Sequence, residues 1–209
     1  MEAAEQARAY AAADLSELHQ GFVEAFASRI GQPRGRCLDL GCGTADISLR
    51  LARACPGLQI VGVDGSEAML AEGRAAVAAA GLEARISLEL RRLPDETLPR
   101  HAYDVVVSNS LLHHLADPLV LWRTLRDCAV PGAPLLVMDL RRPASVAAAR
   151  ELVARHGEHA APVLVKDFLN SLRAAYRLGE VRQQLRTAQL SRCDSAEIGE
   201  IHWIVWGRV

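Results

Sequence analysis

Short apolar runs alternate with longer segments of helical periodicity between residues 36 and 140. This alternation is typical of a mostly parallel sheet with helices on both faces, because each strand needs a long crossover to return parallel to the last. We therefore expect one doubly wound α/β domain. The expected strands are residues 36–40, 59–64, 86–90, 103–109 and 134–139, and the expected helices between them are residues 45–55, 66–80 and 118–128.

The segments on either side of this core add helices and one more strand. Residues 2–30 predict one or two amphipathic helices, and residues 144–157, 166–176 and 179–190 predict three further helices. Residues 201–206 predict a last strand, which the turn at Gly199 joins to residues 193–198 in a hairpin. A chain of 209 residues without internal repeats fits a single domain.

Composition excludes several broad classes of function. The 24 basic and 25 acidic residues nearly cancel, whereas a protein held to nucleic acid by phosphate contacts usually carries a basic excess. No apolar run approaches the roughly 20 residues that span a bilayer, and the first residues are polar. The five cysteines form no metal-binding pattern. We expect a cytoplasmic protein with no metal and no membrane contact, and the charge balance disfavours a nucleic-acid partner without excluding a local basic patch.

The most informative local pattern is a glycine turn between the first predicted strand and the first core helix. There, Gly41 and Gly43 let the backbone approach a ligand closely and expose amides near a helix N-terminus, although a tight structural turn is the alternative. Asp46 stands where the dinucleotide-binding fingerprint has its third glycine. Asp39 would repel a pyrophosphate and attract a cation such as the ammonium group of an amino acid.

A second carboxylate, Asp64, ends the second predicted strand about twenty residues after the glycine turn. From this position a carboxylate accepts hydrogen bonds from both hydroxyls of a ribose. The alternative is that Asp64 only caps the following helix, a role that Ser66 is equally suited to fill. The turn is thus typical of a site for a nucleotide-like cofactor, and Asp64 is the candidate ligand of its ribose.

These motifs resemble the class I S-adenosylmethionine-dependent methyltransferases. The family's D-x-G-x-G turn matches Asp39, Gly41 and Gly43, and the later segment YDVVVSNSLLHHL fits the same family. The resemblance covers residues 35–142, and residues 201–206 match the antiparallel strand that closes the family's Rossmann-like sheet. It implies S-adenosylmethionine as the cofactor and S-adenosylhomocysteine as the product.

The resemblance also suggests roles for individual residues. It places the glycine turn against the methionine part of the cofactor, Asp39 at its amino group and Asp64 at its ribose. Glu89 or Asp95 is the counterpart of the acidic residue that contacts adenine in the family, although Arg91 and Arg92 occupy the usual loop. The expected cofactor-binding residues are Asp39, Gly41, Cys42, Gly43, Asp64, Gly65, Glu89, Asn109 and Tyr10.

His113 and His114 are the candidate catalytic residues, because an imidazole titrates near neutral pH and can take a proton from a substrate hydroxyl. The alternative is that one packs in the interior and the other faces solvent or caps a helix. The resemblance divides the domain into an N-terminal helical lid (1–30), a cofactor-binding core (35–142), a helical substrate-side segment (143–190) and a terminal hairpin (191–209).

The expected activity is in-line methyl transfer to a small molecule by a monomer or homodimer. A methyltransferase for RNA or protein, a non-catalytic S-adenosylmethionine-binding protein and a nicotinamide-dependent oxidoreductase are the alternatives. The oxidoreductase is the least favoured of these, because Asp39 and the missing third glycine argue against a dinucleotide.

Overall fold

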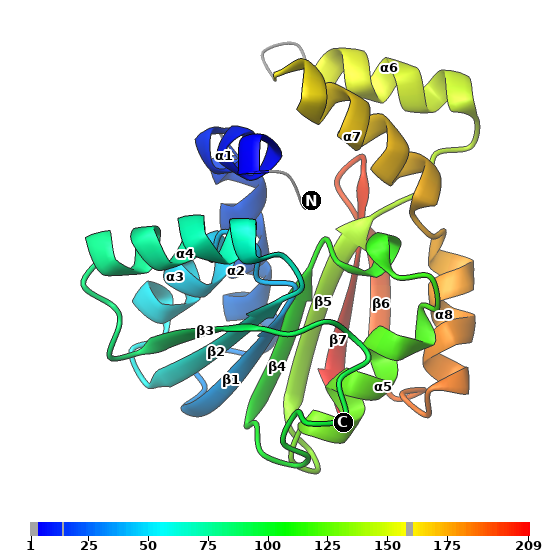
Figure 1. Ribbon diagram of the computed structural model, residues 1–209. Coiled ribbons are helices and arrows are strands. Elements are labelled where there is room, and N and C mark those ends of the chain that lie inside the picture. Colours follow the sequence, from blue (N-terminus) through cyan, green and yellow to red (C-terminus); the bar gives the residue numbers. More distant parts are fainter. Residues whose placement is uncertain (1–3, 14, 158–160) are drawn as a thin grey trace.

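The computed structural model describes residues 4–13, 15–157 and 161–209, with a seven-stranded sheet at its centre (Figure 1). The strand order is β3-β2-β1-β4-β5-β7-β6, and β7 runs in the opposite direction to the other strands. The strands are β1 (Gly35–Leu40), β2 (Leu58–Asp64), β3 (Ile86–Leu90), β4 (Val105–Asn109), β5 (Pro134–Leu140), β6 (Asp194–Ile198) and β7 (His202–Arg208). The predicted sheet is confirmed, including its antiparallel terminal hairpin.

Helices cover both faces of this sheet. Phe22 and Phe26 pack in the apolar layer on one face, and Trp122 and Val181 pack in the layer on the other. Figure 1 shows α2, α3 and α4 on the first side and α5 and α8 on the second. The helices are α1 (Ala4–Ala12), α2 (Ser16–Arg29), α3 (Asp46–Ala54), α4 (Glu67–Ala79), η1 (Leu112–His114, a 3-10 turn), α5 (Leu119–Cys128), α6 (Val146–His156), α7 (Pro162–Ala174) and α8 (Leu178–Thr187).

Most predicted elements lie within two residues of their observed bounds, and α7 is the main exception. This helix was predicted to begin at Lys166 and begins instead at Pro162. Proline suits the first helical position because its ring fixes a helical φ and the N–H that it lacks would have no partner there. Parts of the predicted lid, residues 1–3 and 14, lie outside the described residues.

The direction in which successive strands are added to the sheet reverses at β1. Its neighbours β2 and β4 lie on opposite sides, and the chain winds outwards from β1 towards each edge. In open α/β sheets the crevice beyond the carboxyl ends of the strands at such a switch point is the usual binding site for a ligand. The topology therefore places a ligand site beyond Leu40 and Asn109.

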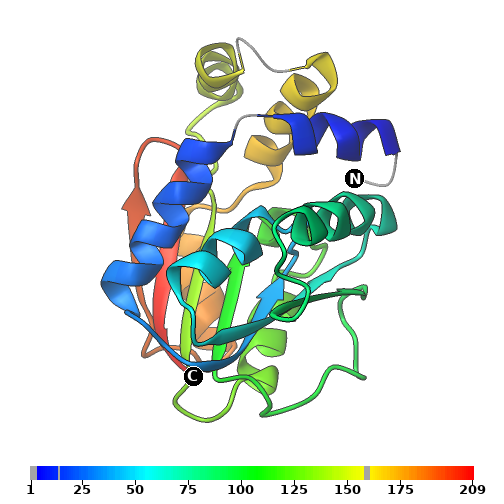
Figure 2. The same ribbon diagram turned by 90° about the vertical axis from the view of Figure 1, so that its left-hand side faces the viewer.

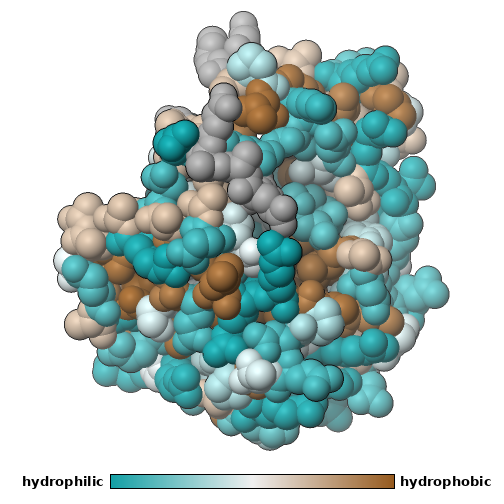
Figure 3. All heavy atoms as spheres, viewed as in Figure 1, coloured by the Kyte–Doolittle hydropathy of each residue, from teal (hydrophilic) through white to brown (hydrophobic). Residues whose placement is uncertain are grey.

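Two helical segments, one containing α1 and the other containing α7, extend over the edge of the sheet at the carboxyl ends of its parallel strands. Figure 2 shows α1 between α4 and α7, and α1 contacts both helices. Gln6 of α1 donates a hydrogen bond to Asp167 of α7, which ties the two segments together. Within the described ranges, no helix is long and apolar enough to cross a membrane. The face shown in Figure 3 is mostly hydrophilic, with apolar residues in small separate groups.

Candidate functional site

A cleft of about 420 Å³ opens at the switch point of the sheet. This volume is within the usual range for small-molecule sites. The cleft brings together most of the residues predicted from the sequence, whereas Glu89 and His113 are not among its described lining residues. The predicted residues in the lining are Tyr10, Asp39, Gly41, Cys42, Gly43, Asp64, Gly65, Asn109 and His114.

The glycine turn forms the floor of the cleft. Gly41 has a φ of +74° and Gly43 has a φ of +53°, a region that residues with a Cβ rarely adopt. A Cβ on Gly41 would lie 2.8 Å from the Cβ of Leu111, so the β4–η1 loop packs directly against the turn. Glycine is therefore required at this position both by conformation and by space.

Cys42, between the two glycines, turns its side chain away from solvent and towards β2. A Cβ on Gly62 would lie 2.9 Å from the Cys42 sulfur, so the thiol occupies the space that a glycine leaves free. Burial raises the pKa of Cys42 well above its ordinary value. The thiol therefore stays protonated and serves as packing, because only the thiolate is a good nucleophile.

Asp39 is a buried carboxyl group at the end of β1. It accepts a hydrogen bond of 2.6 Å from the Ser48 hydroxyl. Burial raises the pKa of Asp39 to about 6, and the charge of Asp64 adds to this, while the Ser48 hydrogen bond acts in the opposite direction. A carboxylate in this setting gains most from a cationic ligand, because a nearby positive charge offsets the cost of desolvation.

Asp64 joins β2 to the glycine turn. Its two carboxylate oxygens accept hydrogen bonds from the backbone N–H groups of Gly43, at 2.9 Å, and Ser66, at 2.8 Å. Ser66 itself caps α4, because its hydroxyl accepts from the Met69 N–H. Each oxygen of Asp64 retains acceptor capacity for the hydroxyls of a ligand.

The opposite wall, at the end of β4, is polar. The side chains of Asn109, Ser110 and His114 line the cleft and make no hydrogen bond within the described part of the chain. Ser110 has a φ of +56°, a strained conformation that clusters at functional sites. Sequence reasoning missed Ser110, because nothing in the pattern marks a left-handed serine.

The two adjacent histidines face different surroundings. His114 lines the cleft, and burial, reinforced by the neighbouring His113, lowers the pKa of His114 to about 4. Its imidazole is therefore neutral at physiological pH. The side chain of His113 is only 4% exposed, and its Nδ1 lies 2.6 Å from the Asp139 carboxylate.

Asp139, at the end of β5, also accepts hydrogen bonds from the N–H groups of Leu112 and Leu140. It thereby fixes η1, which carries both histidines, to the sheet. A carboxylate on Nδ1 also favours the tautomer that leaves Nε2 of His113 as an acceptor.

The rim of the cleft next to the N-terminal helices α1 and α2 carries Tyr10 and a small polar cluster of His19, Asp46 and Arg50. Burial, with the charges of Asp46 and Asp64, raises the pKa of Tyr10 to about 12, so its hydroxyl stays protonated. His19 and Arg50 both contact the Asp46 carboxylate, at 2.7 and 2.6 Å. These three residues border a smaller hollow of about 140 Å³ beside the cleft, and sequence reasoning did not predict them.

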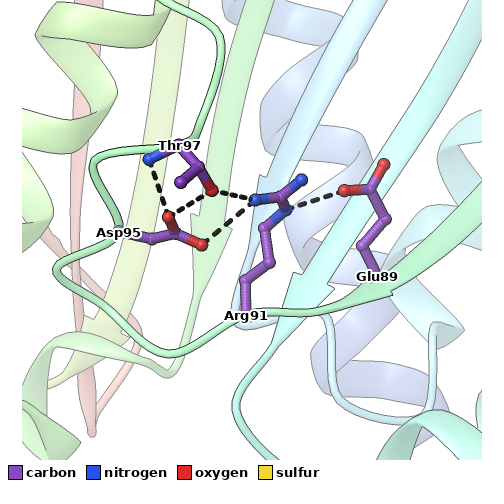
Figure 4. Close-up of polar contacts among 4 residues, drawn as sticks. All are labelled: Glu89, Arg91, Asp95 and Thr97. Carbon is purple, nitrogen blue, oxygen red and sulfur yellow. Dashed lines mark hydrogen bonds and ion pairs between the residues drawn. The ribbon is translucent and has the colours of Figure 1, made fainter.

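The base of the loop after β3 contains the predicted acidic residues in an unexpected arrangement. Glu89 and Asp95 both bind Arg91, which lies between them (Figure 4). Arg91 and Arg92 line the cleft, whereas neither acid is among the described lining residues. The residues that the cleft presents here are therefore cationic.

Comparison with known sequences identifies relatives. Residues 38–135 match a family model described as a methyltransferase domain. A ubiquinone biosynthesis O-methyltransferase of Xanthomonas campestris is 30% identical over 190 residues, covering 86% of this chain and 72% of that protein. One of Hahella chejuensis is 32% identical over 132 residues, covering 62% of this chain but only 52% of its own length. The chain thus spans about half the length of several curated relatives.

Comparison with solved structures finds the same fold. A SAM-dependent methyltransferase from Aquifex aeolicus superposes with a TM-score of 0.71 at 18% identity, covering 100% of this chain and 99% of that one. A second structure, from Methanococcus maripaludis, has a TM-score of 0.72 at 16% identity and covers 98% of this chain and 92% of that one. At these identities, the likeness concerns the fold alone.

Proposed function

Because this chain belongs to the class I S-adenosylmethionine-dependent methyltransferases, we propose that it transfers a methyl group from S-adenosylmethionine to a small-molecule acceptor. The observation that carries the proposal is the position of Asp39 and Asp64 on either side of one glycine turn in one cleft. A dinucleotide site would place a pyrophosphate against Asp39, which makes a nicotinamide-dependent oxidoreductase the weaker alternative.

The residues of the cleft fit the parts of this cofactor. Asp39 would hold its ammonium group, and Asp64 with Gly65 would bind the ribose hydroxyls. The backbone of Gly41, Cys42 and Gly43 lines the cleft and would lie against the methionine part. The bound cofactor would supply a methyl group on a sulfonium, which is already an activated leaving group.

The acceptor would lie on the β4 side, where Asn109, Ser110 and His114 offer polar groups without hydrogen bonds in the described residues. Alignment of acceptor and methyl group would supply most of the rate, because orientation replaces a costly encounter. His114, neutral at physiological pH, is positioned to take a proton from a hydroxyl acceptor, and the contact of Asp139 with His113 holds this turn in place.

Similarity to relatives supports a small acceptor. Several relatives are named as O-methyltransferases of ubiquinone biosynthesis or as C-methyltransferases of ubiquinone and menaquinone biosynthesis. The near-zero net charge of the chain disfavours an RNA acceptor. We further propose that the protein acts in the cytoplasm, which its likeness to bacterial biosynthetic enzymes supports, and that it is a monomer or homodimer.

Calorimetric titration with S-adenosylhomocysteine and with NAD tests the cofactor. We expect S-adenosylhomocysteine to bind and the Asp64→Asn variant to lose about tenfold in affinity, the usual cost of hydrogen bonds to a charged group. Asp194→Asn, on the exposed edge strand β6, is the matched control and should bind like the original chain. Tight binding of NAD without binding of S-adenosylhomocysteine would refute the proposal.

A panel of small hydroxylated aromatic molecules, incubated with labelled S-adenosylmethionine, tests the transfer itself. We expect label in at least one of them and a lower rate constant for His114→Ala with unchanged affinity for S-adenosylhomocysteine. Cofactor binding without transfer to any small molecule, RNA or protein would favour the non-catalytic alternative.

A further inference from the structure

The loop after β3 presents hydrogen-bond donors to the cleft where the family has an acceptor. Arg91, Arg92 and Leu93 line the cleft beside the end of β2, next to the Gly65 backbone. The neighbouring acids, Glu89 near the end of β3 and Asp95 of the loop, are absent from the described lining. If the proposed function is right, this wall borders the purine ring of the cofactor, because the adjacent Asp64 holds the ribose.

Both acids are already bound by one guanidinium group (Figure 4). Arg91 donates from Nε to Glu89 at 2.7 Å, and from Nη1 to Asp95 at 3.1 Å and to the Thr97 hydroxyl at 2.6 Å. Asp95 accepts two further hydrogen bonds, from the Thr97 N–H at 2.8 Å and from its hydroxyl at 2.6 Å. Both carboxylates are therefore held against Arg91, and among the described residues it is Arg91, not either acid, that lines the cleft.

The remaining nitrogen of Arg91, Nη2, has no hydrogen-bond partner among the residues that the structure describes. Its two N–H groups are the part of the side chain left for a ligand. Two carboxylates and a hydroxyl hold the rest of the guanidinium, so its orientation is set before a ligand arrives and little entropy is lost on binding.

The edge of a purine distinguishes donors from acceptors at position 6. Adenine carries an amino group there, which donates, whereas a 6-oxopurine carries a carbonyl oxygen beside N7, and this pair of acceptors is the one that arginine binds best. A carboxylate selects the 6-amino base, and an arginine does not. A site with a carboxylate also rejects a 6-oxopurine strongly, because the carboxylate would be left without a donor. A site without such an acceptor lacks this rejection.

We propose that Arg91 is a specificity-determining residue of the base subsite and that this chain does not select the 6-amino group of adenine. The cleft accepts a cofactor with a 6-oxopurine about as well as one with adenine. Adenosine-linked ligands still bind, because the amino acid and ribose contacts are unaffected by the base.

Calorimetric titration with S-adenosylhomocysteine and with S-inosylhomocysteine, its 6-oxo analogue, tests the inference on the full chain. We expect a preference for S-adenosylhomocysteine smaller than about fivefold, or the reverse preference, since a selective hydrogen-bonding site discriminates by far more. A preference of about fivefold or more would overturn the inference while leaving the proposed function intact. If neither compound binds, the proposed function itself fails.

Arg91→Leu gives a second, independent measurement. This substitution removes the guanidinium donors that favour a 6-oxopurine and leaves Glu89 and Asp95 without the cation that neutralises them beside the base subsite. The preference for S-adenosylhomocysteine over the inosine compound should therefore rise by about fivefold or more relative to the original chain. An unchanged or lower preference would contradict the role of Arg91.

The matched control is Arg74→Leu, which breaks the exposed ion pair of Arg74 with Glu67 on α4. Arg74 is not among the described residues that line the cleft, so this variant should keep the original preference. A change as large as that in Arg91→Leu would mean that net charge, and not the Arg91 contacts, sets the preference.

Discussion

The buried carboxyl group of Asp39 links the chemistry of a single residue to a measurable pH dependence. Burial raises its pKa to about 6, and only the ionised form attracts an ammonium group. Affinity for S-adenosylhomocysteine should therefore fall as pH drops below 6, by about tenfold at pH 5 relative to pH 7.5. Calorimetric titration at several pH values measures this slope.

Asp39→Asn is the variant that isolates this effect. The amide keeps the shape of the side chain but cannot ionise, so affinity should be low at every pH and the slope near pH 6 should disappear. An unchanged slope in Asp39→Asn would assign the pH dependence to another group.

Gly62 tests the packing beneath the glycine turn. A Cβ at this position would lie 2.7 Å from a Leu88 methyl group and 2.9 Å from the Cys42 sulfur. Gly62→Ala should therefore reduce the free energy of unfolding by about 1–3 kcal/mol, the usual cost of overpacking. Urea denaturation measures the change.

Gly21→Ala is the control for this substitution. Gly21 lies within α2, and nothing lies within 4 Å of the position of its added Cβ. This variant should gain about 0.5–1 kcal/mol, because alanine favours a helix over glycine. Equal effects of the two substitutions would show that packing at Gly62 is not the cause.

Many of the binding residues were predictable because short motifs place them. Asp39, Gly41, Gly43 and Asp64 each follow from where a strand ends, and all four line the cleft. The partners of buried or paired groups were not predictable, because the pairing depends on residues far apart in the chain. Asp139 binds His113 across 26 positions.

The loop after β3 shows a second limit. Glu89 and Arg91 are close in sequence, but the periodicity does not indicate which member of an ion pair faces a cleft. In the structure, Arg91 lines the cleft, and hydrogen bonds to Asp95 and Thr97 hold its guanidinium group there.

At the scale of elements, α1 joins the two sides of the site. It contacts α4 on the cofactor side and α7 on the far side, and the hydrogen bond from Gln6 to Asp167 fixes the second contact. Asp167→Ala should speed the dissociation of S-adenosylhomocysteine by about fivefold, because one hydrogen bond contributes about 1 kcal/mol. Stopped-flow displacement measures this rate.

Lys166→Ala, at the neighbouring exposed position of α7, controls for a general effect on the helix. Its dissociation rate should equal that of the original chain. Equal rates in all three proteins would mean that α1 does not hold the ligand in place.

The elements themselves were largely predictable. Alternation of strand and helix patterns gave β1 to β5, because parallel strands buried on both faces appear as continuous apolar runs. The short turn η1 was not predicted, since three residues are too few for any periodicity. Its position depends on the distant Asp139 carboxylate.

At the scale of the whole molecule, three titratable groups shape how stability varies with pH: the buried Asp39, the partly buried His202 and the exposed His114. Burial lowers the pKa of His114 and His202 to about 4, so between pH 4 and 6.5 the unfolded chain binds protons that the folded chain does not. Stability therefore falls as pH drops through this window. The raised pKa of Asp39, about 6, has the opposite effect, because the folded chain then binds a proton that the unfolded chain does not. This single group offsets part of the loss of stability caused by the two histidines.

The free energy of unfolding should consequently be lower at pH 5 than at pH 7, by only about 1 kcal/mol, because water screens much of the effect at the exposed His114. Urea denaturation at the two pH values measures the difference, and His202→Gln should reduce it. Equal or greater stability at pH 5 would contradict these assignments.

The position of β7 has a consequence for the order in which the protein forms during synthesis. This strand lies between β5 and β6 although it follows β6 in the chain, so a nascent chain that has exposed β6 has no neighbour for it in the sheet. Strands β1 to β5 can pair on the ribosome, whereas β6 must wait for β7. When β7 pairs, the ring of Trp203 comes to 6.2 Å from the ring of Trp122, centroid to centroid. Tryptophan fluorescence can therefore follow the insertion of β7 into the sheet.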